Sequence, residues 1–116
     1  MSNYSKTHVT DCAPRVELHD TLALTGAEVS VNKMAAGTEV PFIHSHKENE
    51  EIYFILSGKG YMEIDGEKVD LEAGDWLRVA PQAKRKLHAT TDLIEVCIQV
   101  KAGSLKQWTM TDAVVE

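Results

Sequence analysis

The chain is built from short runs in which apolar and polar residues alternate, with turn residues between them roughly every eight to twelve positions. Alternation with a period of two is typical of half-buried β-strands, because successive side chains of a strand point to opposite faces. No stretch of about 11 residues carries an apolar stripe at helical spacing. The pattern therefore predicts an all-β fold, either a sandwich or a closed barrel.

Two positions constrain how the predicted strands connect. Asp65-Gly66 predicts a two-residue hairpin, because both residues tolerate a positive φ. Pro41 cannot donate a ladder hydrogen bond, which predicts an edge or strand-start position. The strands we expect cover residues 27–34, 40–46, 51–56, 61–64, 67–71, 76–80, 87–89 and 93–100.

Three side chains suited to metal binding lie within eight residues of one another: His44, His46 and Glu51. On a strand, the two histidines would project from one face about 6.5–7 Å apart, and the polar turn at 47–50 would bring Glu51 back beside them. Imidazole and carboxylate donors suit zinc, iron, manganese or nickel, so we expect a divalent transition metal. Two alternatives stay open: a different turn register would make Glu50 the ligand, and the histidines would need only hydrogen bonds in a metal-free barrel.

Residues two positions from these ligands should face the same cavity. Counting by twos places Phe42 beside His44, and Tyr53 and Ile55 beyond Glu51. Tyr53 is the candidate catalytic residue, which would move or position a proton; the alternative is that it fills the core and hydrogen-bonds locally. We take Phe42, Tyr53 and Ile55 as candidate substrate-binding residues.

The spacing Gly37, six residues, His44-x-His46, four residues, Glu51, six residues, Gly58 resembles the first signature of the cupin superfamily. The resemblance implies a single-domain double-stranded β-helix, a jelly-roll-like barrel, in which His44, His46 and Glu51 bind the metal. It also implies chemistry found among cupins, as a metal-dependent dioxygenase, isomerase or lyase. Turnover itself is left open by the sequence.

The second cupin signature ends in a third metal-binding histidine, and this chain departs from it in the stretch GDWLRVAPQAKRKLHA. Counting from Gly74 places Arg85 at the position of that histidine, and anchoring on Pro81 places Lys86 there. Period-two parity favours Arg85 inside and His88 outside on the surface, although a one-residue bulge would turn His88 towards the metal. Arg85 inside the barrel is a candidate for binding a carboxylate or phosphate. The alternative is an ion pair with Glu51 in place of a metal.

Composition limits the partners. The 116 residues suit one domain, with an arm or edge strand at 1–20, the barrel at 21–103, and a segment at 104–116 that packs on the barrel or a partner subunit. The net charge of −6 argues against nucleic acid. Without a signal peptide or a long apolar run, we expect no membrane contact and a cytoplasmic location. Cys12 and Cys97 should be free thiols, and a homodimer would hide exposed strand edges.

These observations support two hypotheses. The first is a small metal-binding cupin that acts on or binds a small anionic metabolite. The second is a non-catalytic cupin that binds a small ligand or works as a sensor.

Overall fold

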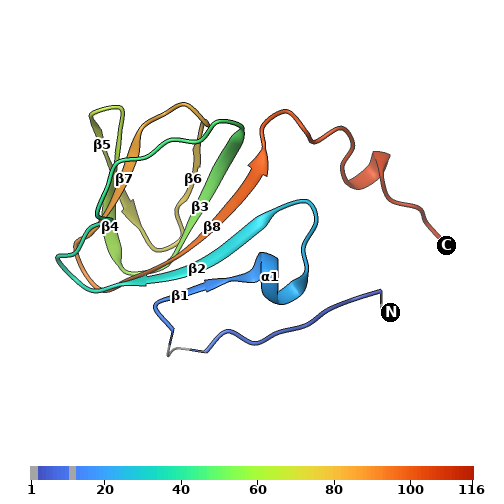
Figure 1. Ribbon diagram of the computed structural model, residues 1–116, viewed down its shortest axis with the longest axis horizontal. Helices are drawn as coiled ribbons and strands as arrows, with labels where there is room; N and C mark the ends of the chain where they lie inside the picture. The colour runs from blue at the N-terminus through green and yellow to red at the C-terminus, as the bar shows by residue number, and fades with distance from the viewer. Residues whose placement is uncertain (1–2, 11–12) are drawn as a thin grey trace.

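The computed structural model describes residues 3–10 and 13–116, and its strands form two antiparallel sheets that face each other (Figure 1). The larger sheet has the strand order β1-β2-β8-β3-β6 and the smaller sheet the order β5-β4-β7. The all-β fold expected from the sequence is confirmed. The larger sheet comprises β1 (Arg15–Glu17), β2 (Glu28–Met34), β8 (Leu93–Lys101), β3 (Asn49–Ser57) and β6 (Trp76–Val79). The smaller sheet comprises β5 (Glu67–Glu72), β4 (Lys59–Ile64) and β7 (Arg85–Ala89).

The core lies between the sheets, and strand β3 shows how the sequence builds it. Glu51, Tyr53 and Ile55 are buried, whereas the residues between them are half-buried, as period-two alternation requires. Ile55 and Met62 are completely shielded from solvent. The apolar core consists of Tyr53, Ile55, Met62, Leu71, Val79, Ala83, Leu87, Ala89, Leu93 and Cys97.

The hairpin between β4 and β5 forms where the sequence predicts it. Ile64 pairs with Glu67, so the loop contains two residues only. Asp65 has φ 51° and Gly66 has φ 84°, and two consecutive positive φ angles are those of a type I′ turn, whose twist matches the flanking strands.

The continuous strand predicted for residues 40–46 is wrong. This segment runs along β7 and makes two isolated bridges, Glu39 with His88 and His44 with Arg85. The chain bends at residues 41–42 between the bridges. Pro41 has no N–H to donate, so the ladder is interrupted there and resumes only where His44 N–H donates to the Arg85 carbonyl at 3.1 Å.

Residues 3–10 and 104–116 lie outside the two-sheet core (Figure 1). In the N-terminal part, β1 pairs with β2 at the edge of the larger sheet and leads into the short helix α1 (Leu18–Leu22), which the sequence pattern did not predict. The C-terminal segment beyond residue 103 extends away from the sheets and contains the 3₁₀ helix η1 (Thr109–Thr111). Among residues 3–10 and 13–116, no helix has the length and apolar character needed to cross a membrane.

Candidate metal centre

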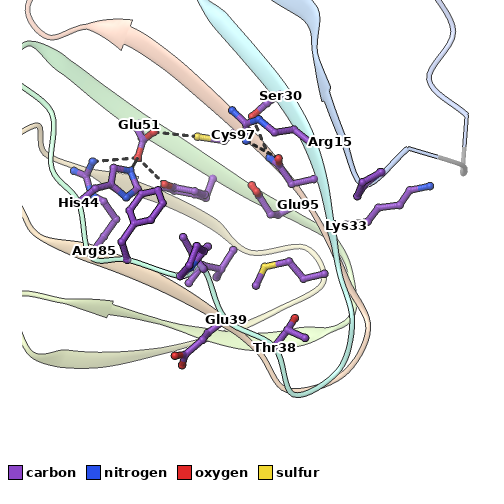
Figure 2. A pocket seen from close by; sticks show the side chains of 18 of the residues that line it. Arg15, Ser30, Lys33, Thr38, Glu39, His44, Glu51, Arg85, Glu95 and Cys97 are labelled. Carbon is purple, nitrogen blue, oxygen red and sulfur yellow. Dashed lines mark hydrogen bonds and ion pairs between the residues drawn. The ribbon is translucent and has the colours of Figure 1, made fainter.

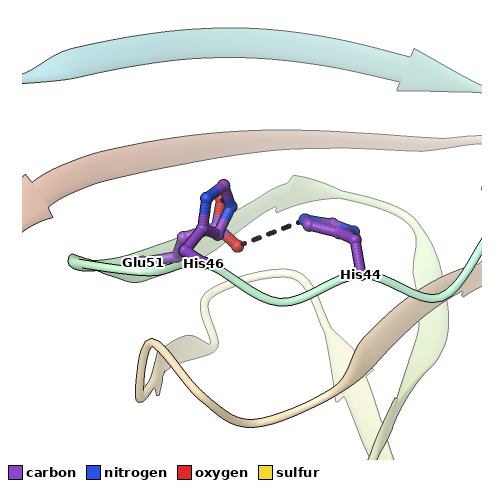
Figure 3. Close-up of side chains that lie close together, drawn as sticks. All are labelled: His44, His46 and Glu51. Atoms are coloured by element: carbon purple, nitrogen blue, oxygen red, sulfur yellow. Dashed lines mark hydrogen bonds and ion pairs between the residues drawn. The ribbon is translucent and has the colours of Figure 1, made fainter.

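His44, His46 and Glu51 converge on one point, as Figure 3 shows. One nitrogen of each histidine and one carboxylate oxygen all lie within 4.8 Å of one another. Nε2 of His44 is 3.9 Å from Glu51 Oε1, and Nε2 of His46 is 3.1 Å from Glu51 Oε2. Glu50 points elsewhere, because it accepts a hydrogen bond from Arg78 Nε at 2.8 Å. Glu51, and not Glu50, is therefore the carboxylate beside the histidines.

Backbone hydrogen bonds hold the two histidines in place. His44 exchanges a reciprocal pair with Arg85, at 3.1 and 3.0 Å, and His46 N–H donates to the Pro81 carbonyl at 2.8 Å. The two imidazole rings are nearly perpendicular, with centroids 5.1 Å apart. Both rings therefore reach the same point although the segment that carries them is not a regular strand.

The arrangement fits a divalent ion. Metal–ligand bonds of about 2.1 Å place neighbouring donors roughly 3.0–3.4 Å apart. The His46–Glu51 separation of 3.1 Å lies in this range, and the His44–Glu51 separation of 3.9 Å is wider. Burial lowers the pKa of His44, an effect that Glu51 opposes, so the ring favours the neutral form that binds metals. Its Nδ1 is buried and has no hydrogen-bond partner among the described residues. The donor set is thus suited to zinc, iron, manganese or nickel.

Glu51 is buried and accepts hydrogen bonds from several side chains, some of which are drawn in Figure 2. Its Oε1 accepts hydrogen bonds from the Tyr53 hydroxyl at 2.5 Å and from Arg85 Nη1 at 3.1 Å. Its Oε2 accepts a weak hydrogen bond from the Cys97 thiol at 3.4 Å. Burial raises the pKa of Tyr53 and of Cys97, so both stay protonated and continue to donate. These donors fix the orientation of the carboxylate.

Arg85 faces inward and is 1% exposed, in the orientation that parity favours. Besides its bond to Glu51, its Nη2 donates to the Ala80 carbonyl at 2.5 Å. Two of its three guanidinium nitrogens are therefore committed to protein acceptors. The sequence left two roles open for Arg85, binding an anionic ligand or forming an ion pair with Glu51. The structure shows the ion pair.

His88 points away from the centre, on the outer face of the smaller sheet. Its ring stacks on Tyr61, with centroids 4.3 Å apart, and its nitrogens lie 2.9 Å from Glu39 and 3.0 Å from Glu63. These contacts leave it only 9% exposed, so the expectation of a surface residue is wrong while the expectation that it faces outward holds.

The centre opens into a cavity of about 640 Å³. Tyr53 lines its wall, and Phe42, which is 60% exposed, lies at its rim with its ring 5.9 Å from that of His44. Ile55 packs instead into the apolar core.

Several cavity residues were not singled out from the sequence: Ser30, Asn32, Glu95, Cys97 and Gln99. They share the inner face of the larger sheet with Glu51, because strand register places Ser30 opposite Cys97, Asn32 opposite Glu95 and Gln99 opposite Glu51. Period-two alternation alone places residues 95, 97 and 99 on one face of their strand. It does not indicate which strands pair with that strand. Cys97 is a free thiol, whereas Cys12 lies outside the described residues.

Comparisons with known proteins show the family of this fold. The family model of the cupin domain matches residues 30–100. The crystal structure of a cupin protein from Bacteroides fragilis is 63% identical with a TM-score of 0.95, covering 100% of this chain and 99% of that chain. That of a predicted oxalate decarboxylase from Thermotoga maritima is 27% identical with a TM-score of 0.57, covering 65% of this chain and 64% of that chain. An uncharacterized protein from Methanocaldococcus jannaschii is 40% identical over 45 residues, which are 39% of this chain and 36% of that relative.

Proposed function

The chain belongs to the cupin family, and from that premise we propose that it is a metal-binding cupin that binds or transforms a small anionic metabolite. The observation that carries the proposal is the convergence of His44, His46 and Glu51 within 4.8 Å at the wall of a cavity large enough for a small molecule. A divalent ion bound there supplies a Lewis acid with coordination positions open to water or a ligand oxygen.

The charge balance of the site supports an anionic ligand. The positive charge of Arg85 offsets the negative charge of Glu51, with which it forms a buried ion pair. His44 favours the neutral form. The full double charge of the ion would therefore remain to attract a carboxylate or phosphate.

The residues around the donors have separate roles in this proposal. Arg85, Tyr53 and Cys97 hold Glu51 in the orientation that binds metal. Tyr53, whose raised pKa keeps it protonated, has its hydroxyl directed at Glu51 and acts as a positioning residue. Phe42 covers the rim of the cavity and would exclude water from a bound ligand. Dioxygenase, isomerase and lyase chemistry each suit an open site of this kind.

The second candidate function is a ligand-binding or sensor cupin without turnover. Its support is the ion pair itself, because Arg85 compensates the Glu51 charge even without a metal. A metal-free barrel would then still be a stable binding module.

We also propose that two copies associate through the C-terminal segment, residues 104–116. Five large apolar side chains of this segment are 63–91% exposed in the single chain, and a second copy would cover them. They are Leu105, Trp108, Met110, Val114 and Val115.

Metal analysis of protein purified without chelator or nickel resin tests the main proposal. We expect about one divalent ion per chain in the wild type and loss of that ion in His44→Ala and His46→Ala. His19→Ala is the matched control, because this histidine is exposed and far along the chain from the centre, and it should retain the ion. Substoichiometric metal that His44→Ala leaves unchanged would reject the metal site and favour the second candidate.

With the ion present, oxygen consumption across a panel of keto acids, thiols and diols separates dioxygenase chemistry from redox-neutral chemistry. Binding of such compounds without any turnover would favour the sensor function.

A further inference from the structure

The cavity has a second polar end, away from the metal centre. Glu95 on β8 lines it, is 4% exposed, and pairs across the sheet with Asn32 on β2. Figure 2 shows Glu95 with Arg15 and Ser30 on one side of the cavity, and His44, Glu51 and Arg85 on the other. Oε2 of Glu95 is buried without a hydrogen-bond partner in the described part of the chain.

Asn32 makes a side-chain hydrogen bond with the Glu95 carboxyl group, but the surrounding groups leave Oε2 without a donor. Arg15 Nη1 donates to Asn32 Oδ1 at 2.7 Å, and Asn32 Nδ2 donates to Ser30 Oγ at 3.0 Å. These side chains are engaged with one another beside the carboxyl group. A buried carboxyl oxygen without a donor is unfavourable, so a ligand that brings one would gain binding energy there.

Strand register sets the separation of the two ends. Gln99 lies opposite Glu51, and Glu95 is four residues away along β8, which corresponds to about 13 Å of strand. Tyr53 and Cys97 form the row between these two levels. Val40 and Leu87, from the facing segments, also line the cavity, and Met34 lines it beyond Glu95, where it pairs with Leu93. The cavity thus has two separate polar groups, the metal centre and Glu95, with the row of Tyr53, Cys97 and Ser30 between them.

We propose that Glu95 recognises the far end of an elongated ligand by accepting a hydrogen bond from its amino or hydroxyl group. The other end of that ligand, a carboxylate, binds at the His44–His46–Glu51 centre. The metal–carboxylate contact of about 2 Å and the terminal hydrogen bond of about 3 Å take up part of the separation, so a carbon chain of about five to eight atoms spans the rest. This inference rests on the proposed function, because it uses the metal centre to anchor the carboxylate.

Burial also affects the protonation of Glu95, and the group can accept a hydrogen bond from the ligand whether or not it is protonated. Desolvation raises its pKa to about 7, an effect that Asn32 and Arg15 oppose. In both protonation states the group retains an oxygen that accepts a hydrogen bond. An ammonium group on the ligand would in addition compensate the charged form.

Calorimetric titration of the zinc-loaded full chain tests the proposal. The ligands are unsubstituted carboxylates of five to eight carbons and their ω-hydroxy and ω-amino counterparts of equal length. For at least one length, the wild type should bind a donor-bearing ligand about tenfold more tightly than the unsubstituted one, as expected for one buried hydrogen bond.

Two variants separate the sources of that preference. Glu95→Gln keeps a neutral acceptor and should lose the preference for the amino ligand but keep that for the hydroxy ligand. Glu95→Leu should lose both while still binding the unsubstituted carboxylate, which also shows that the variant is folded. Glu50→Gln, on the outer face, is the matched control and should bind like the wild type.

Equal affinity for substituted and unsubstituted ligands in the wild type would overturn the inference, as would a preference that persists in Glu95→Leu or binding of none of the carboxylates. Zinc stoichiometry, measured on the same samples, reports separately on the proposed function. One zinc per chain without any donor preference rejects only the role of Glu95. Failure to retain zinc rejects the metal site as well.

Discussion

Nη1 of Arg85 lies 3.1 Å from Oε1 of Glu51, and the two side chains are only 1% and 3% exposed. The backbone of Arg85 also pairs with that of His44, and counting from Gly74 places Arg85 at the position of the third histidine in the cupin signature. The site therefore combines a three-donor centre with a built-in cation that holds its carboxylate.

Replacing Arg85 with methionine should lower the free energy of unfolding of the metal-free protein by about 3 kcal/mol, because Glu51 would be left as a buried charge without its partner. Urea denaturation measures the loss. Arg78→Met is the matched control: its pair with Glu50 involves an arginine side chain that is 64% exposed, so the change should cost less than about 1 kcal/mol.

Zinc should stabilise Arg85→Met more than it stabilises the wild type, because the ion restores a positive charge beside Glu51. A smaller zinc-induced rise in Tm for the variant would contradict this account of the ion pair.

Tyr53→Phe should lower the free energy of unfolding by about 1–2 kcal/mol, because it removes a hydroxyl that donates to a buried carboxylate. Tyr61→Phe serves as the control, since Tyr61 uses its ring, and not its hydroxyl, to stack on His88. Chemical denaturation of both variants compares them. Equal losses would show that the Tyr53–Glu51 bond contributes nothing specific.

Glu95 should make the protein less stable as the pH rises. Its pKa is raised from 4.5 to about 7 in the folded chain, so between these values the folded state binds more protons than the unfolded state. Its contribution is complete below about pH 4.5 and is lost as the pH rises through about 7, a change of about 3 kcal/mol. The difference in unfolding free energy between wild type and Glu95→Gln, measured by urea denaturation from pH 4.5 to 7.5, should follow this curve. A constant difference would refute it.

Gly58→Ala should be far more damaging than Gly66→Ala. Both glycines have a positive φ, 88° and 84°, so both substitutions carry a backbone cost of about 1 kcal/mol. A Cβ at Gly58 would in addition lie 2.0 Å from the carbonyl oxygen of Asp92, whereas a Cβ at Gly66 meets nothing within 4 Å among the described residues. Thermal denaturation should show a much larger fall in Tm for Gly58→Ala. Similar falls would mean that the β3–β4 turn relaxes without cost.

Removing residues 105–116 should convert a dimer into a monomer if the exposed apolar segment is the contact between copies. Light scattering coupled to size-exclusion chromatography measures the mass of both forms. The truncated chain should keep its zinc content, because the metal donors lie in the barrel. A truncated protein that remains dimeric would place the interface elsewhere.

The local features of the fold could be predicted because they depend on neighbours in the chain. Alternation in β3 places Glu51 and Tyr53 on one face whatever the rest of the protein does, and Asp65-Gly66 specifies its turn through backbone preference alone. The spacing of His44, His46 and Glu51 pointed to the candidate metal centre, although the two histidines do not lie on a regular strand and are held by backbone hydrogen bonds to Arg85 and Pro81.

Tertiary structure decided the rest. Period-two alternation indicated that Arg85 faces inward. Only the approach of β7 to β3 made Glu51, 34 residues away in the sequence, its partner. Glu95 became part of the cavity because β8 lies between β2 and β3, and no local pattern specifies which strands become neighbours. Strand pairing depends on contacts between distant segments, so the sequence alone indicated the candidate metal donors and the tertiary structure determined how they converge and what faces them.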